Sequence, residues 1–112
     1  MAYTRKRAPS GWRRIAWTDY EAAVFVPKTA EIRKKSFRDC VAFVVDGAVF
    51  VRNEDTWNTR EDVRRHEIEH LKQRQFFGPE LYEFLYAWLH DVSGYKQHPF
   101  EVLARKAEKK KG

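Results

Sequence analysis

The alternation of apolar and polar residues predicts strands in the first half of the chain and helices in the second. Two largely apolar runs, 41–45 and 48–52, flank the pair Asp46-Gly47. Asp-Gly is a preferred type I′ turn, because both central residues need a positive φ and glycine adopts it without a Cβ clash. The segment is therefore predicted to be a β-hairpin. Both arms are almost continuously apolar, so both faces are expected to be covered.

Before the hairpin the pattern is weaker. The apolar run 23–26 ends at a proline and predicts a short strand. Thr29 is a candidate N-cap for a short helix over 30–38. Residues 12–20 fit neither the helical nor the strand period, so no element is predicted there.

After a predicted loop over 53–58, the sequence predicts three helices. The first begins with Thr59 as its N-cap and ends at Gly78. The second runs from Pro79 to about Asp91, and the third opens with a proline after His98. The second helix has an apolar stripe at helical spacing that is expected to be buried: Leu81, Phe84, Leu85, Trp88 and Val92. The third is expected to turn four residues inward: Phe100, Leu103, Ala104 and Ala107. Gly94 fits a helix end between them.

The first of these helices contains the sequence His66-Glu67-Ile68-Glu69-His70, an H-E-x-x-H motif. Residues four apart on a helix lie one turn above each other, so the two imidazoles point into the same volume. Two neutral imidazoles there can bind one Zn²⁺. Glu67 would flank the metal without binding it and could accept a proton from activated water. The alternative is a charged helix face with solvated histidines.

A catalytic zinc site needs a third protein ligand. The candidates downstream are His90, Asp91, His98 and Glu101. Glu101 follows Phe100, which is expected to face the core, so its carboxylate can point into a cleft at the boundary. It could equally form a surface ion pair one turn along its helix. The residues alone leave both possibilities open.

Composition indicates a folded single domain. The chain has 112 residues, of which 43% are hydrophobic and 15% aromatic. No apolar run approaches the roughly 18 residues of a membrane span. Cys40 is the one cysteine, which excludes an internal disulfide, and its place at the start of a strand-like run predicts a buried, inert thiol.

The net charge of +6 is concentrated at the two ends of the chain. Residues 1–14 carry five basic residues and no acid, and residues 105–112 carry five basic residues and one acid. We therefore expect a flexible basic arm over 1–11, one domain over 12–108, and a basic tail over 109–112. The ends could contact an acidic partner or simply be solvated. Tyr82, Tyr86 and Trp88 could line a pocket, although core packing is the more usual role of such residues.

The sequence around the motif resembles a known family. The residues His66 to Gln73, the pair Gly78-Pro79, and Tyr95 to Arg105 are similar to small zincin-like metallopeptidases of bacteria and phages. That family has H-E-hydrophobic-x-H-x-x-Q, a helical hairpin, and then Y-R-x-N-P-F-E-x-x-A. The likeness covers roughly residues 23–107 and implies a gluzincin-like α+β domain, with a short hairpin or sheet packed on the motif helix and two further helices.

The resemblance implies that Glu101 is the third zinc ligand, beside His66 and His70. This chain departs from the family pattern at two positions. His98 stands where asparagine is usual, as a different N-cap or as an additional imidazole near the metal, and Glu69 stands where a small or apolar residue is common.

The expected function is zinc-dependent hydrolysis of a peptide or protein substrate. Glu67 would act as the proton acceptor. Tyr95 is the candidate donor to the developing oxyanion, with His98 as runner-up. Gln73 is a candidate for orienting a ligand histidine. The hairpin could border the metal cleft and accept an extended peptide as an added strand.

Two other functions remain open at this point. The first is a catalytically silent protein in which zinc stabilises a small domain, acting as a structural or assembly component, for example of a phage particle. The second is a nucleic-acid binder that uses the basic ends. No secretory signal is visible, so the expected location is the cytoplasm or a phage particle.

Overall fold

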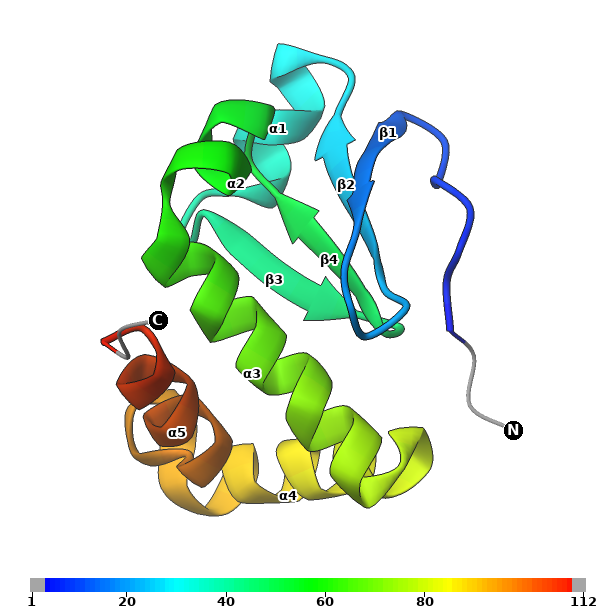
Figure 1. Ribbon diagram of the computed structural model, residues 1–112. Helices are drawn as coiled ribbons and strands as arrows, with labels where there is room; N and C mark the ends of the chain where they lie inside the picture. The colour runs from blue at the N-terminus through cyan, green and yellow to red at the C-terminus, as the bar shows by residue number, and fades with distance from the viewer. Residues whose placement is uncertain (1–3, 110–112) are drawn as a thin grey trace.

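A mixed four-stranded sheet forms the upper layer of the computed structural model, which describes residues 4–109 (Figure 1). Its strands are β1 (Trp12–Trp17), β2 (Ala23–Pro27), β3 (Ala42–Val45) and β4 (Ala48–Val51). They lie in the order β1-β2-β4-β3. β2 and β4 are parallel, and the two outer pairings are antiparallel. β3 is therefore one edge of the sheet.

Five helices accompany the sheet in the described part of the chain, which confirms the predicted α+β class. They are α1 (Ala30–Ser36), α2 (Glu54–Thr59), α3 (Glu61–Phe77), α4 (Pro79–Gln97) and α5 (Pro99–Ala107). α3 runs from the sheet layer down to α4 and α5, which lie together at the lower end of the molecule (Figure 1). Within residues 4–109, no helix has the length and apolar character that crossing a bilayer requires.

Alternate residues of the central strands supply two separate apolar clusters. Val24 and Val49 face one side, where they pack with Trp57 of α2 and with α3. Phe25 and Phe50 face the other side, where they pack with Phe37 after α1. The period of two in a strand accounts for this division, because successive side chains point to opposite faces. Covering both faces leaves β4 fully buried.

The predicted hairpin is confirmed. Asp46 and Gly47 have φ values of 52° and 72°, which is the left-handed backbone that a type I′ turn requires. Thr29 is the N-cap of α1, since its side chain accepts a hydrogen bond from the backbone N–H of Ile32. The predicted strand at 23–26 is also confirmed, and the undecided stretch 12–20 contains β1.

Three local predictions were wrong. The expected loop 53–58 is mostly helix α2, because the Asn53 side chain caps it by accepting from the N–H of Thr56. Thr59 therefore ends α2 instead of capping the motif helix, whose N-cap is Arg60 without a side-chain cap bond. Cys40 is exposed, because β3 begins two residues later and the thiol precedes the sheet.

The apolar stripe of α4 is also not buried as predicted. Four of its five residues are exposed: Leu81, Phe84, Trp88 and Val92. The helix instead turns Tyr82 inward, onto Phe100 of α5 with ring centroids 5.3 Å apart. In α5, Phe100 and Ala104 are buried as predicted, but Leu103 is half exposed.

The ends of the chain are described only in part. Residues 1–3 of the predicted arm and 110–112 of the predicted tail lie outside the described residues. Arg5, within the arm, donates its backbone N–H to the carbonyl oxygen of Asp46 at 2.8 Å.

Candidate metal centre

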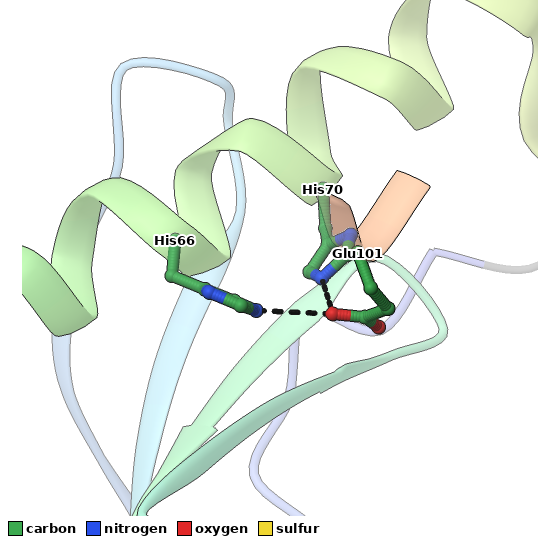
Figure 2. A group of neighbouring side chains, drawn as sticks. All are labelled: His66, His70 and Glu101. Carbon is green, nitrogen blue, oxygen red and sulfur yellow. Dashed lines mark hydrogen bonds and ion pairs between the residues drawn. The ribbon is translucent and has the colours of Figure 1, made fainter. Parts of the chain in front are cut away.

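Three side chains from α3 and α5 converge on one point. His66 and His70 lie one turn apart on α3, and Glu101 lies in the first turn of α5. The Nε2 atoms of both histidines are 3.1 Å from the same oxygen, Oε1 of Glu101 (Figure 2). The helical spacing of the histidines and the proline start of α5 produce this convergence.

These residues fit a metal ion. One donor atom of each residue lies within 4.8 Å of the donor atoms of the other two. Among residues 4–109, these three are the group of His, Cys, Asp or Glu side chains close enough together to hold one ion. With ligand bonds of about 2.0–2.2 Å, donor atoms around a tetrahedral ion are separated by about 3.3–3.6 Å. The two 3.1 Å separations are close to that edge length. Two imidazoles and a carboxylate also form the donor set of one class of zinc enzymes.

The orientation of His70 is set by a chain of hydrogen bonds. Its Nδ1–H donates to Oε1 of Gln73 at 3.1 Å, and Nε2 of Gln73 donates to the carbonyl oxygen of Phe100 at 3.0 Å. Protonation at Nδ1 leaves the Nε2 lone pair for a metal. The prediction that Gln73 orients a ligand histidine agrees with this geometry. The same contacts tie α3 to the start of α5.

Two further contacts were missed by the sequence analysis. Nδ1 of His66 lies 2.6 Å from Oε2 of Glu108, and the hydroxyl of Tyr86 donates to Oε2 of Glu101. Glu108 is seven residues after Glu101, two helical turns on, so both carboxylates lie on one face of the last helix. That spacing was a usable signal for Glu108. Tyr86, for which core packing is the more usual role, lines the cleft instead.

In the metal-free site, pairing between acidic and basic side chains shifts the pKa values of His66 and Glu101 more than burial does. Burial favours neutral His66, but its hydrogen bond to Glu101, the nearby Glu67 and the bond to Glu108 together raise its pKa to about 9. Burial would also raise the pKa of Glu101, yet its close pairing with His66 and His70 and the hydrogen bond from Tyr86 hold it far below its usual range. The metal-free site therefore carries an ionised Glu101 beside a protonated His66 at neutral pH.

Glu67 occupies a different environment on the same helix. Its side chain is only 5% exposed, and it lines the same cleft as the histidines. Burial raises its pKa to about 7, against the opposing effect of His66 and His70. A carboxylate whose pKa lies near 7 can both accept and release a proton at neutral pH.

The cleft at the site has a volume of about 490 Å³. One wall is formed by six consecutive residues, 42–47, which are β3 and its turn. Because side chains alternate along a strand, an uninterrupted run of lining residues means that the edge of β3 faces the cleft. This confirms the prediction that the hairpin borders the site. Tyr82, Tyr86 and Tyr95 also line the cleft.

The other candidate residues have separate outcomes. Tyr95 lines the cleft, and burial raises the pKa of its phenol. His98 is fully buried with both ring nitrogens engaged: Nε2 donates to the carbonyl of Tyr86, and Nδ1 accepts from the N–H of Phe100. It is therefore the N-cap of α5, and its alternative roles as ligand or oxyanion donor were wrong. His90 and Asp91 are exposed on α4, outside the group of converging donors.

Comparison with protein-family models, with curated proteins and with solved structures found no match.

Proposed function

We propose that this protein is a zinc-dependent peptidase with a zincin-like, gluzincin-type site. The observation that carries the proposal is the convergence of the His66 and His70 Nε2 atoms on one Glu101 oxygen, inside a cleft that also contains buried Glu67. His66, His70 and Glu101 would hold the zinc ion. When bound, zinc polarises a carbonyl and lowers the pKa of a water toward about 7.

Glu67 would move the proton. Its carboxylate, with a pKa of about 7, would accept a proton from the attacking water and pass it to the leaving amine as the C–N bond breaks. Tyr95 lies on the cleft wall with a raised phenol pKa, so it would stay protonated and could donate to the developing oxyanion. Gln73 and Glu108 would orient the imidazoles.

The shape of the cleft supports a peptide as the substrate. β3 is an edge strand, and the side of it that faces the cleft does not pair with β4. An extended segment could add to this edge through backbone hydrogen bonds, with its scissile bond opposite the histidines. This is the arrangement expected for a peptidase that binds its substrate as an additional strand.

The experiment that tests the proposal compares Glu67→Gln with Glu69→Gln. Both remove one carboxylate from α3, but only Glu67 lines the cleft. Zinc content would be measured by mass spectrometry of the metal, and cleavage would be measured on a mixed peptide library. We expect both variants to retain zinc, Glu67→Gln to lose about 10²-fold or more in activity, and Glu69→Gln to remain near the parent. Full activity in Glu67→Gln would refute the assigned mechanism.

A structural zinc site is the second candidate. The donors join α3 to α5, and Glu108 adds a contact between His66 and the end of the last helix. In a domain of this size, an ion at that junction would add stability. A parent protein that binds one zinc, unfolds on chelation and cleaves nothing in the library would favour this candidate over the peptidase.

A further inference from the structure

The outer face of α4 is apolar and uncovered in the described part of the chain. Leu81, Phe84, Trp88 and Val92 are 49%, 67%, 53% and 63% exposed, and we call these four residues the α4 stripe. At 100° per residue they fall within an arc of about 80°. Tyr82 and Tyr86, which face the candidate metal centre, lie more than about 100° away from the middle of that arc. In Figure 1, α4 lies along the lower edge of the molecule, with α3 and α5 above it.

The composition of the stripe is that of a buried helix face. A helix that faces solvent normally places polar side chains on its outer side, whereas the outer side of α4 carries apolar side chains at helical spacing. With about 100 Å² exposed for each large side chain, the stripe offers on the order of 400 Å² of apolar surface. A pair of packed helices also buries residues that flank the contact. The buried area of each copy would therefore approach the roughly 800 Å² per partner of a standard interface.

We propose that the chain forms a homodimer in which the α4 stripes of two copies pack antiparallel across a two-fold axis. A two-fold interface uses the same patch on both subunits, so a continuous stripe on one helix is suited to it. Antiparallel packing also brings the opposite ends of the two helix dipoles together. From Leu81 to Val92 the stripe is about 16 Å long.

The antiparallel arrangement fixes which residues meet. The midpoint of the stripe lies between Phe84 and Trp88, so Phe84 would pack against Trp88 of the partner subunit, and Leu81 against Val92 of the partner subunit. The proposal involves the face of α4 that points away from the metal centre. It requires neither zinc nor peptidase activity, and its failure would leave the proposed function untouched.

The first test is the molar mass of the full chain in solution. Sedimentation equilibrium from about 1 to 100 µM should show an assembly of twice 13.4 kDa that does not grow further. Because the contact is apolar, it should persist in about 1 M salt, where association through the basic ends would dissociate. A monomer throughout this range, growth beyond two copies, or loss of the dimer in salt would overturn the proposal.

The second test uses variants. Phe84→Glu and Trp88→Lys should each weaken dimerisation by at least about 100-fold, because each places two charges in the interface. Trp17→Glu is the matched control: Trp17 is 48% exposed on β1, and this variant should dimerise like the parent. Since Phe84 and Trp88 are already exposed in the single chain, circular dichroism of the dilute variants should match that of the parent.

Mixing the two monomeric variants tests the register. In an antiparallel pair, Phe84→Glu of one copy would face Trp88→Lys of the other, and the second Phe84–Trp88 contact would remain intact. Equimolar mixing should therefore restore a dimer that neither variant forms alone. If the variants remain dimeric separately, or if the mixture stays monomeric while the parent dimerises, the assigned interface is wrong.

Discussion

Replacing Glu101 with glutamine is the most direct probe of the candidate metal centre. The substitution keeps the size of the side chain and a hydrogen-bonding group for Tyr86, but it removes the negative charge. In the parent, one Glu101 oxygen lies 3.1 Å from the Nε2 atom of each histidine, and the side chain is almost completely buried. We expect Glu101→Gln to lose most of the affinity for zinc.

The size of the effect follows from the contacts. Loss of a residue that only orients a ligand costs about 10–100-fold in metal affinity, so loss of a ligand should cost at least about 100-fold, or about 2.7 kcal/mol. Glu108→Gln is the matched control, because the Glu108 carboxylate contacts Nδ1 of His66, the nitrogen that faces away from Glu101, and is a third exposed. It should weaken zinc binding by about 10-fold.

The assay is competition with a chromophoric zinc chelator, supported by metal analysis after dialysis. The expected order of affinity is parent, then Glu108→Gln, then Glu101→Gln. The metal-free Glu101→Gln protein should also be less stable by about 1–3 kcal/mol in urea unfolding, because it loses a buried partner of both histidines. Parent-like zinc affinity in Glu101→Gln would refute the three-ligand centre.

Two further predictions concern stability. Because the pKa of His66 is raised to about 9 in the metal-free protein, the stabilisation from its pairing should be complete below about pH 6.5 and disappear as the pH rises through 9. Zinc must displace that proton, so the stabilisation that zinc provides should grow as the pH rises over the same interval. Urea unfolding at several pH values, with chelator and with zinc, measures both pH dependences. If the free energy of unfolding changed with pH in the same way in both conditions, the pairing of His66 with the carboxylates would be contradicted. Gly47→Ala should destabilise by about 2 kcal/mol or more, because φ is +72° and a Cβ would lie 2.4 Å from Nη1 of buried Arg74. Gly94→Ala has a similar φ but no atom within 4 Å, so it should cost about 1 kcal/mol, and equal melting temperatures for the two variants would show that the Arg74 contact is unimportant.

The features that could be predicted from sequence are those fixed by neighbours along the chain. The Asp46-Gly47 turn depends on two φ angles, the Thr29 cap on one hydrogen bond, and the pairing of His66 with His70 on helical geometry. Each of these is decided within a few residues. The position of Glu101 needed the resemblance as well, because spacing alone left a surface ion pair equally open.

The features that could not be predicted from the sequence depend on which part of the molecule packs against a given residue. The period of Leu81, Phe84 and Trp88 establishes an apolar helix face, but it does not reveal whether this chain covers that face. Tyr82 and Tyr86 point inward instead, where Tyr82 stacks on Phe100 and the Tyr86 hydroxyl donates to Glu101. Cys40 precedes β3 by two residues, a boundary that an apolar run cannot locate.

The two apolar clusters of the described residues have a consequence for the metal-free protein. Both clusters are built on the sheet with α2, α3 and Phe37, and neither includes a residue of α4 or α5. These last two helices are attached to α3 by a small set of aromatic contacts and by the polar bonds around Glu101. An ion bound there would hold α4 and α5 against α3 reversibly. Dissociation of the ion could therefore let these two helices detach by local unfolding while the sheet stayed folded.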